Sequence, residues 1–78
     1  MLVKRSLALS GHRTSVALEP EFWAALGAVA TARGQTLAAL VASVDAARAA
    51  DRPLASALRV LALIEAGRAG AGPGTASP

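Results

Sequence analysis

The clearest hydrophobic pattern in the chain is an alternation over residues 13–18. Thr14, Val16 and Leu18 fall on one side at a period of two, and polar or small residues separate them. This period predicts a β-strand with one buried face. A lone strand would leave backbone N–H and C=O groups unpaired along both edges, so another strand must pair with it. The candidates are the preceding segment and a second copy of the chain.

The preceding segment, residues 4–9, alternates more weakly and is separated from the strand by Ser10 and Gly11. A Ser-Gly pair between two such runs is a turn signal. We therefore expect residues 4–9 to fold back on residues 13–18 as a hairpin. The alternative is a flexible arm whose charges stay free for a partner.

Three segments with helical spacing follow the strand. We expect the first helix over residues 20–33, because Pro20 suits the first helical position and Gly34 suits a left-handed C-cap. The second begins after Thr36, a side-chain N-cap, and runs to about residue 49 or 50. The third spans residues 54–66 and ends at Gly67. The apolar positions of the first helix are Phe22, Leu26, Val29 and Ala30, with Trp23 on the flank of this stripe. Those of the second helix are Leu37, Leu40, Val41 and Val44. Those of the third helix are Leu54, Ala57, Leu58, Leu61 and Ile64.

The chain is 78 residues long, which allows one small domain. We place it at residues 1–66 and expect residues 67–78, rich in Gly, Pro, Ala and Ser, to be a disordered tail. The core of so short a chain rarely supplies more than about 3–5 kcal/mol of folding stability, so we expect disulfides, a metal or oligomerisation to add to it. The chain has no cysteine and only one histidine, which leaves oligomerisation and predicts no metal and no cofactor.

The hydrophobic fraction is 54%, but much of it is alanine, which favours close-packed small helices over a large apolar core. No apolar run approaches the roughly 18 residues of a membrane span. The apolar stretch after Met1–Arg5 is too short for a signal peptide. We expect a soluble, cytoplasmic protein with no membrane partner.

The net charge is +3, and Lys4, Arg5 and Arg13 all precede the first acidic residue, Glu19. This basic N-terminal segment is either an ordinary solvated terminus or a basic face that binds phosphate. Dimerisation would double the number of basic residues on such a face. Apart from the single histidine, His12, the sequence offers no candidate for a Ser/His/Asp or Cys/His catalytic set. It also has no glycine-rich phosphate-binding loop. We do not expect an enzyme.

The order of strand, helix, glycine and Thr-capped helix resembles the ribbon-helix-helix family of Arc/MetJ-type repressors. The matching residues are 13–19, 20–33 and 34–37. Residues 4–6, 11–16, 19–26 and 56–60 resemble a subgroup of short, uncharacterised bacterial ribbon-helix-helix proteins. The resemblance implies a mainly α fold with a short β element: an intertwined homodimer in which two strands pair as a ribbon above shared helices. An N-terminal extra strand and a third C-terminal helix are additions to it.

The resemblance also implies a homodimeric DNA-binding protein, a transcriptional regulator with its β-ribbon in the major groove and helix N-termini on phosphates. The alternative is a protein-protein interaction or assembly module, in which the extra strand and third helix engage a partner protein or a second dimer, giving a tetramer. A four-stranded sheet with a covered outward face would favour this alternative. The implied base contacts are Arg13, Ser15 and Ala17; the phosphate contacts are Lys4, Arg5, Gln35, Thr36 and Leu37; and the dimer core is Val16, Leu18, Phe22, Leu26, Val29, Leu40, Val41 and Val44.

Overall fold

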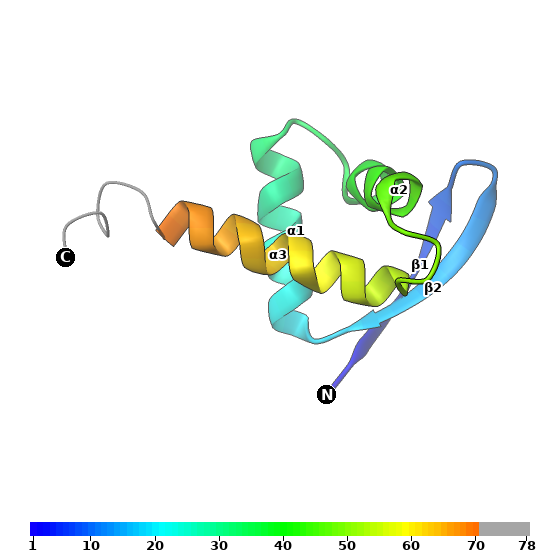
Figure 1. Cartoon of the computed structure of the whole chain (residues 1–78), viewed down its shortest axis with the longest axis horizontal. Helices are drawn as coiled ribbons and strands as arrows, with labels where there is room; N and C mark the ends of the chain where they lie inside the picture. Colours follow the sequence, from blue (N-terminus) through cyan, green and yellow to red (C-terminus); the bar gives the residue numbers. More distant parts are fainter. Residues whose placement is uncertain (71–78) are drawn as a thin grey trace.

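The computed structural model describes residues 1–70, which form a β-hairpin followed by three helices (Figure 1). This is the ribbon-helix-helix arrangement with an additional C-terminal helix that the sequence predicted. The elements are β1 (Val3–Leu9), β2 (His12–Leu18), α1 (Pro20–Ala32), α2 (Leu37–Ala47) and α3 (Leu54–Gly70).

The hairpin predicted from residues 4–9 and 13–18 is confirmed. β1 pairs antiparallel with β2, and Leu9 lies opposite His12 at the closed end. Ser10 and Gly11 make the two-residue turn with φ values of 30° and 88°. Both values are positive, as a type I′ turn requires, and the twist of such a turn matches that of the strands. The preceding segment of the same chain therefore pairs with one edge of β2.

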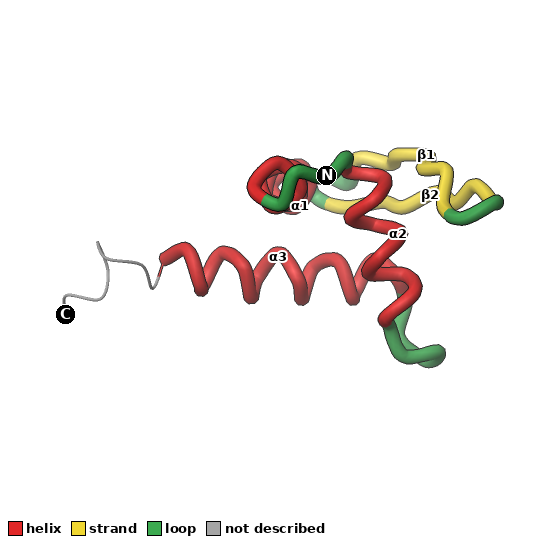
Figure 2. The backbone as a smooth tube through the Cα atoms, turned by 90° about the horizontal axis from the view of Figure 1, so that it is seen from above, coloured by secondary structure: helices red, strands yellow, loops and turns green. Residues whose placement is uncertain are grey.

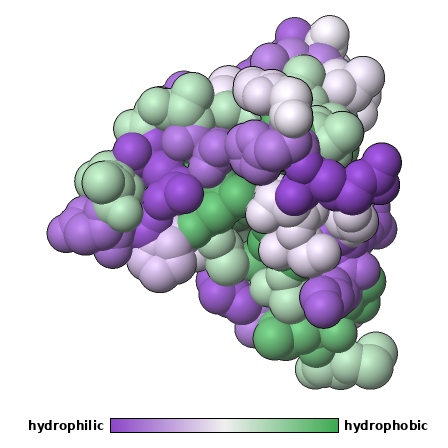
Figure 3. Space-filling model, turned by 90° about the vertical axis from the view of Figure 1, so that its right-hand side faces the viewer, coloured by the Kyte–Doolittle hydropathy of each residue, from purple (hydrophilic) through white to green (hydrophobic). Residues whose placement is uncertain are grey.

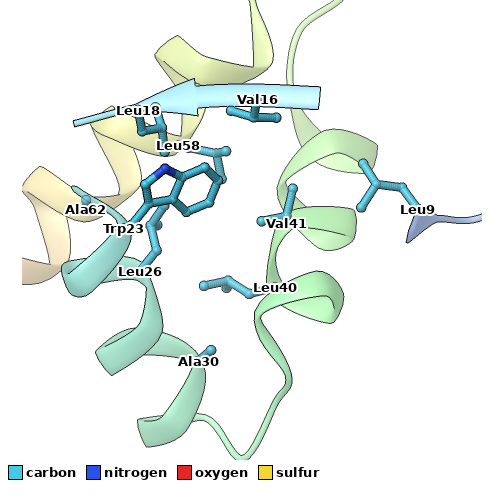
Figure 4. Packing of buried hydrophobic residues seen from close by; sticks show 10 residues of the cluster. All are labelled: Leu9, Val16, Leu18, Trp23, Leu26, Ala30, Leu40, Val41, Leu58 and Ala62. Carbon is cyan, nitrogen blue, oxygen red and sulfur yellow. The ribbon is translucent and has the colours of Figure 1, made fainter. Parts of the chain in front are cut away.

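The helices cover one face of the hairpin. α2 packs against β1, α3 packs against β2, and α1 contacts both other helices. Apolar side chains from all five elements meet between them, and Figure 4 shows Trp23 at the centre of this cluster. The buried members are Leu9, Val16, Leu18, Trp23, Leu26, Ala30, Leu40, Val41, Leu58 and Ala62.

The residues expected in a dimer core are already largely enclosed within the single chain. Val16, Leu18, Leu26, Leu40 and Val41 are buried. The rest are only partly buried against the same cluster, namely Phe22, Val29 and Val44. The assignment of these eight residues to a dimer interface stays a prediction.

The first two helices end close to their predicted positions. α1 ends at Ala32, and Gly34 takes the left-handed conformation with φ of 68°. α2 ends at Ala47, earlier than expected, because Arg48 is extended. The Arg48 guanidinium donates to Asp45 at 2.9 Å and to the Arg52 carbonyl at 2.7 Å, which holds the chain in this turn.

The prediction that Gly67 ends the third helix was wrong, since α3 continues to Gly70. A glycine inside a helix costs about 1 kcal/mol relative to alanine, which lowers stability without forcing a stop. Glu65 and Arg68 pair at 3.8 Å on successive turns and so support the helix across Gly67. Residues 71–78 of the predicted tail lie outside the described residues.

Within residues 1–70, no single helix is long and apolar enough to cross a bilayer. α1 and α2 meet the length and composition criteria only when taken together, and they are bent by 97° at the break between them.

Candidate nucleic-acid interface

The hairpin has an outward face that points away from the helices. Residues paired across an antiparallel ladder point to the same side, and successive residues alternate. Val16 and Leu18 enter the core, so Arg13, Ser15 and Ala17 point outward. Their partners in β1 are Ala8, Ser6 and Lys4 respectively. The six residues of this outward face are Lys4, Ser6, Ala8, Arg13, Ser15 and Ala17.

The outward face is exposed and carries no acidic residue. Lys4, Ser6, Arg13 and Ser15 are exposed, and Ala17 is half-buried. Figure 3 looks onto the hairpin end of the molecule and shows a band of hydrophilic surface across it. The face is therefore polar, basic and open to a partner.

The two cations of the outward face stand apart. Lys4 is level with Ala17, four residues along β2 from Arg13. At about 3.3 Å per residue the two positions are about 13 Å apart. Neither side chain belongs to any of the ion pairs found within residues 1–70, which are Arg33–Glu65, Arg48–Asp45, Arg59–Glu19 and Arg68–Glu65. Both charges are thus uncompensated by the described part of the chain.

Arg5 does not join this face. It lies opposite Val16 and so points to the helical side of the hairpin. Its guanidinium carbon sits 5.1 Å from the centre of the Trp23 ring, a cation–π distance. The sequence indicated a basic run of two residues, but the alternation of the strand sends its members to opposite sides.

The Trp23 indole also anchors the start of β1. Its Nε1 donates a hydrogen bond of 2.7 Å to the carbonyl oxygen of Val3. Trp23 was expected to be a core residue on the flank of the α1 apolar stripe, and its 3% exposure agrees with this prediction. Because a buried indole N–H needs an acceptor, this bond satisfies the tryptophan and fixes the hairpin to α1.

The start of α2 is capped as predicted. Thr36 is extended, and its Oγ1 accepts from the backbone N–H of Ala39 at 3.0 Å. Thr36 is exposed, and Gln35 and Leu37 are half-buried. The backbone N–H of Gln35 donates to the Ala30 carbonyl at 2.8 Å, so it is already used at the end of α1. Figure 2 shows α2 beginning level with the strands and running away toward the α2–α3 loop.

Residues 1–70 contain no group of three His, Cys, Asp or Glu side chains able to hold a metal ion. His12 is exposed at the closed end of the hairpin. Glu19, at the junction of β2 and α1, pairs with Arg59 of α3 at 3.0 Å. Hydrogen bonding from its own backbone, and then from Arg59, lowers the pKa of the Glu19 carboxyl below its usual value.

A family model for the ribbon-helix-helix domain matches residues 2–66. The chain belongs to the ribbon-helix-helix family. Ribbon-helix-helix domains are non-enzymatic and typically form dimers that bind DNA. The family generally includes DNA-binding transcription regulators. The match includes β1 and most of α3, so both additions lie inside the ribbon-helix-helix region. Neither the curated proteins nor the solved structures gave a match.

Proposed function

We propose that this ribbon-helix-helix protein is a homodimeric DNA-binding transcriptional regulator that places the outward face of its hairpin in the major groove. The observation that carries the proposal is the exposed, acid-free outward face with Lys4 and Arg13. The major groove is about 12 Å wide and admits a two-stranded β-ribbon. The open face supports DNA binding over the protein-interaction alternative.

Arg13 is the principal base contact in this proposal. A guanidinium can donate two hydrogen bonds to O6 and N7 of one guanine, the commonest specific contact in the major groove. Ser15 lies two residues along the same face and can donate to or accept from most bases. Ala17 offers a methyl contact to thymine. A dimer presents two such sets and so reads two half-sites.

Lys4 and the start of α2 are the phosphate contacts. The separation of about 13 Å along the strands between Lys4 and Arg13 is close to the groove width. This spacing supports a position for Lys4 at the groove edge when Arg13 reaches the bases. The Thr36 hydroxyl and the Leu37 backbone N–H at the α2 N-terminus favour an anion by hydrogen bonding and by the helix dipole. Gln35 contributes its side chain to the phosphate contacts. Arg5 is left out of this set, because its guanidinium lies over the Trp23 ring.

The test is fluorescence anisotropy on a mixed-sequence duplex at low salt with wild type, Arg13→Glu and Arg52→Glu. Arg52 is an exposed arginine of the α2–α3 loop, at the end of α2 remote from the strands, and serves as the charge-matched control (Figure 2). We expect Arg13→Glu to weaken binding about tenfold or more, since a bidentate contact is worth about 1–3 kcal/mol. Arg52→Glu should stay within about twofold. Full affinity in Arg13→Glu contradicts the proposal.

A further inference from the structure

The hairpin passes into α1 through a single residue. β2 ends at Leu18 and α1 begins at Pro20, so Glu19 alone connects them. The backbone of Glu19 is extended, and its carbonyl oxygen accepts hydrogen bonds from the N–H groups of Phe22 at 3.0 Å and Trp23 at 3.2 Å. The ring of Pro20 restricts the next φ. The conformation of Glu19 therefore sets the angle at which the hairpin leaves α1.

The side chain of Glu19 is not used as a helix cap. N-cap positions favour Ser, Thr, Asp and Asn, whose short side chains reach the first free N–H groups of a helix. Within residues 1–70, the Glu19 side chain makes no capping hydrogen bond to α1. It is held from the third helix instead, because Nε of Arg59 donates to its Oε1 at 3.0 Å and Nη2 lies 3.0 Å from the same oxygen. The connecting residue is thus tied to α3, 40 positions along the chain.

Arg59 contacts both sides of this connection. Its guanidinium carbon lies 5.8 Å from the centre of the Phe22 ring, a cation–π distance. Phe22 belongs to the first turn of α1, whereas Glu19 directly follows β2. One arginine of α3 therefore bridges the end of the hairpin and the start of α1.

The core fixes the place of Arg59. Its neighbour Leu58 is fully buried, as is Leu18 at the end of β2, and both belong to one cluster (Figure 4). α3 crosses α1 and packs against β2 (Figure 1). Burial of Leu58 sets the rotation of α3 about its own axis, and this rotation directs Arg59 to the connection between β2 and α1.

The ion pair suits a role in orientation better than one in stability. The Arg59 and Glu19 side chains are 34% and 40% exposed, and pairs so open to water contribute little to the free energy of unfolding. Their geometry is nevertheless specific, since one guanidinium meets a carboxylate and a ring at once.

We propose that Arg59 is a positioning residue, which through Glu19 and Phe22 fixes the orientation of the hairpin, and so of the outward face, relative to α1. Where it concerns DNA, this inference rests on the proposed function, because a base-reading face must be held in place by the residues that support it. The third helix, an addition to the minimal ribbon-helix-helix fold, thereby takes part in recognition without touching nucleic acid.

A second anchor acts at the same end of the hairpin. Val3, whose carbonyl oxygen accepts from Trp23 of α1, lies opposite Leu18 in the strand pairing. Glu19 follows Leu18 directly. The open end of the hairpin is therefore held on β1 by α1 and on β2 by α3. Because the Trp23 anchor stays in place when Arg59 is removed, we expect the hairpin to reorient rather than to unfold.

Residual dipolar couplings of the backbone amides test this orientation without DNA, in wild type, Arg59→Ala, Glu19→Ala and Arg33→Ala. Arg33 is the matched control, because it also pairs with a glutamate of α3, Glu65 at 3.4 Å, but about 20 Å along α1 from its start. The couplings of β1 and β2 should shift relative to those of α1 in Arg59→Ala and in Glu19→Ala, and not in Arg33→Ala. Circular dichroism should show all variants folded. Unchanged couplings in Arg59→Ala and Glu19→Ala overturn the proposal.

Fluorescence anisotropy on a duplex tests the consequence for DNA binding. Arg59→Ala should weaken binding by about three- to tenfold, as expected of a mutation that acts through packing. Its salt slope should equal that of wild type, because no phosphate contact is lost. Arg33→Ala should stay within about twofold of wild type. A slope reduced by about one contact per chain would show that Arg59 binds phosphate itself, and this result or an unchanged affinity overturns its positioning role in DNA binding.

A double-mutant cycle shows whether Arg59 acts through Glu19. In the Glu19→Ala background, Arg59→Ala should change the affinity by less than about twofold, because its partner is already gone. The full three- to tenfold loss in that background would mean that the two residues act independently, which contradicts the proposal. If wild type does not bind DNA at low salt, the proposed function fails, while the dipolar couplings still decide the role of Arg59.

Discussion

The indole Nε1 of Trp23 donates a hydrogen bond of 2.7 Å to the carbonyl oxygen of Val3, and so joins α1 to the first residue of β1. Arg5 lies over the same ring at 5.1 Å. One buried side chain thus holds the hairpin in two ways, through its N–H and through its ring face. The position of the outward face on the molecule depends on this contact.

The first prediction concerns this contact. Trp23→Phe should lower the free energy of unfolding by about 1–3 kcal/mol, because it removes the hydrogen bond to Val3 and part of a buried ring. Arg5→Ala should cost less, about 0.5–1 kcal/mol, because it removes only a cation–π contact at an exposed site. Urea unfolding followed by circular dichroism measures both changes. A Trp23→Phe variant as stable as wild type would show that the anchor has no energetic role.

The second prediction compares two glycines that both have open space around them. Gly11→Ala should destabilise the protein by about 1–2 kcal/mol, because φ is 88° in the hairpin turn and an L side chain is strained there. Gly27→Ala, inside α1, should stabilise it by about 0.5–1 kcal/mol through helix propensity. Thermal unfolding of the two variants should move in opposite directions. A Gly11→Ala variant as stable as wild type, or more stable, contradicts the turn geometry, and a destabilised Gly27→Ala variant contradicts the helix-propensity argument.

The third prediction separates capping from anion binding at Thr36. Thr36→Ala should cost about 1 kcal/mol of stability, since it removes the acceptor for the Ala39 N–H. Thr36→Asp keeps a capping oxygen and so should preserve stability, while its negative charge should weaken DNA binding. Unfolding and anisotropy are measured on the same samples. If Thr36→Asp binds DNA as wild type does, the α2 N-terminus is not a phosphate contact.

The fourth prediction concerns pH. The pKa of Glu19 is lowered in the folded protein by hydrogen bonds from its own backbone and from Arg59. The ionised carboxylate therefore favours folding at pH values above the ordinary glutamate pKa. This contribution should be lost as the pH falls through the lowered pKa. The melting temperature of wild type should fall toward that of Glu19→Gln in acid, and a constant difference between them from neutral to acid pH would rule the ion pair out.

Much of the hairpin could be predicted because its signals are local. The alternation over 13–18 gave the buried and outward sides of β2, and Ser10-Gly11 gave the turn. Lys4 and Arg5 are neighbours along the chain and suggested one basic patch, but they point to opposite sides of the hairpin. The assignment of Arg5 to a phosphate stays a prediction. The aromatic ring that attracts Arg5 lies in α1, and this contact depends on how the hairpin docks, which the sequence pattern does not encode.

The helix ends show the same limit. Thr36 was identified as a cap because its signal lies within one turn. Gly67 was expected to end the third helix, but α3 continues to Gly70, and Glu65 and Arg68 pair across Gly67 at 3.8 Å. α2 ends early because Arg48 bonds to Asp45 and to the Arg52 carbonyl. These side-chain contacts lie at the ends of α2 and α3, and residue propensities alone do not reveal them.

The most direct test of the DNA-binding claim is a salt titration of wild type, Lys4→Ala and Arg52→Ala on one duplex by fluorescence anisotropy. The logarithm of the binding constant should fall linearly with the logarithm of salt concentration, with a slope of about −0.9 for each phosphate contact. Lys4→Ala should flatten this slope by about one contact per chain, and Arg52→Ala should leave it unchanged. Absence of binding at the lowest salt, or an equal slope in Lys4→Ala and wild type, would contradict the proposal that the outward face of the hairpin contacts DNA.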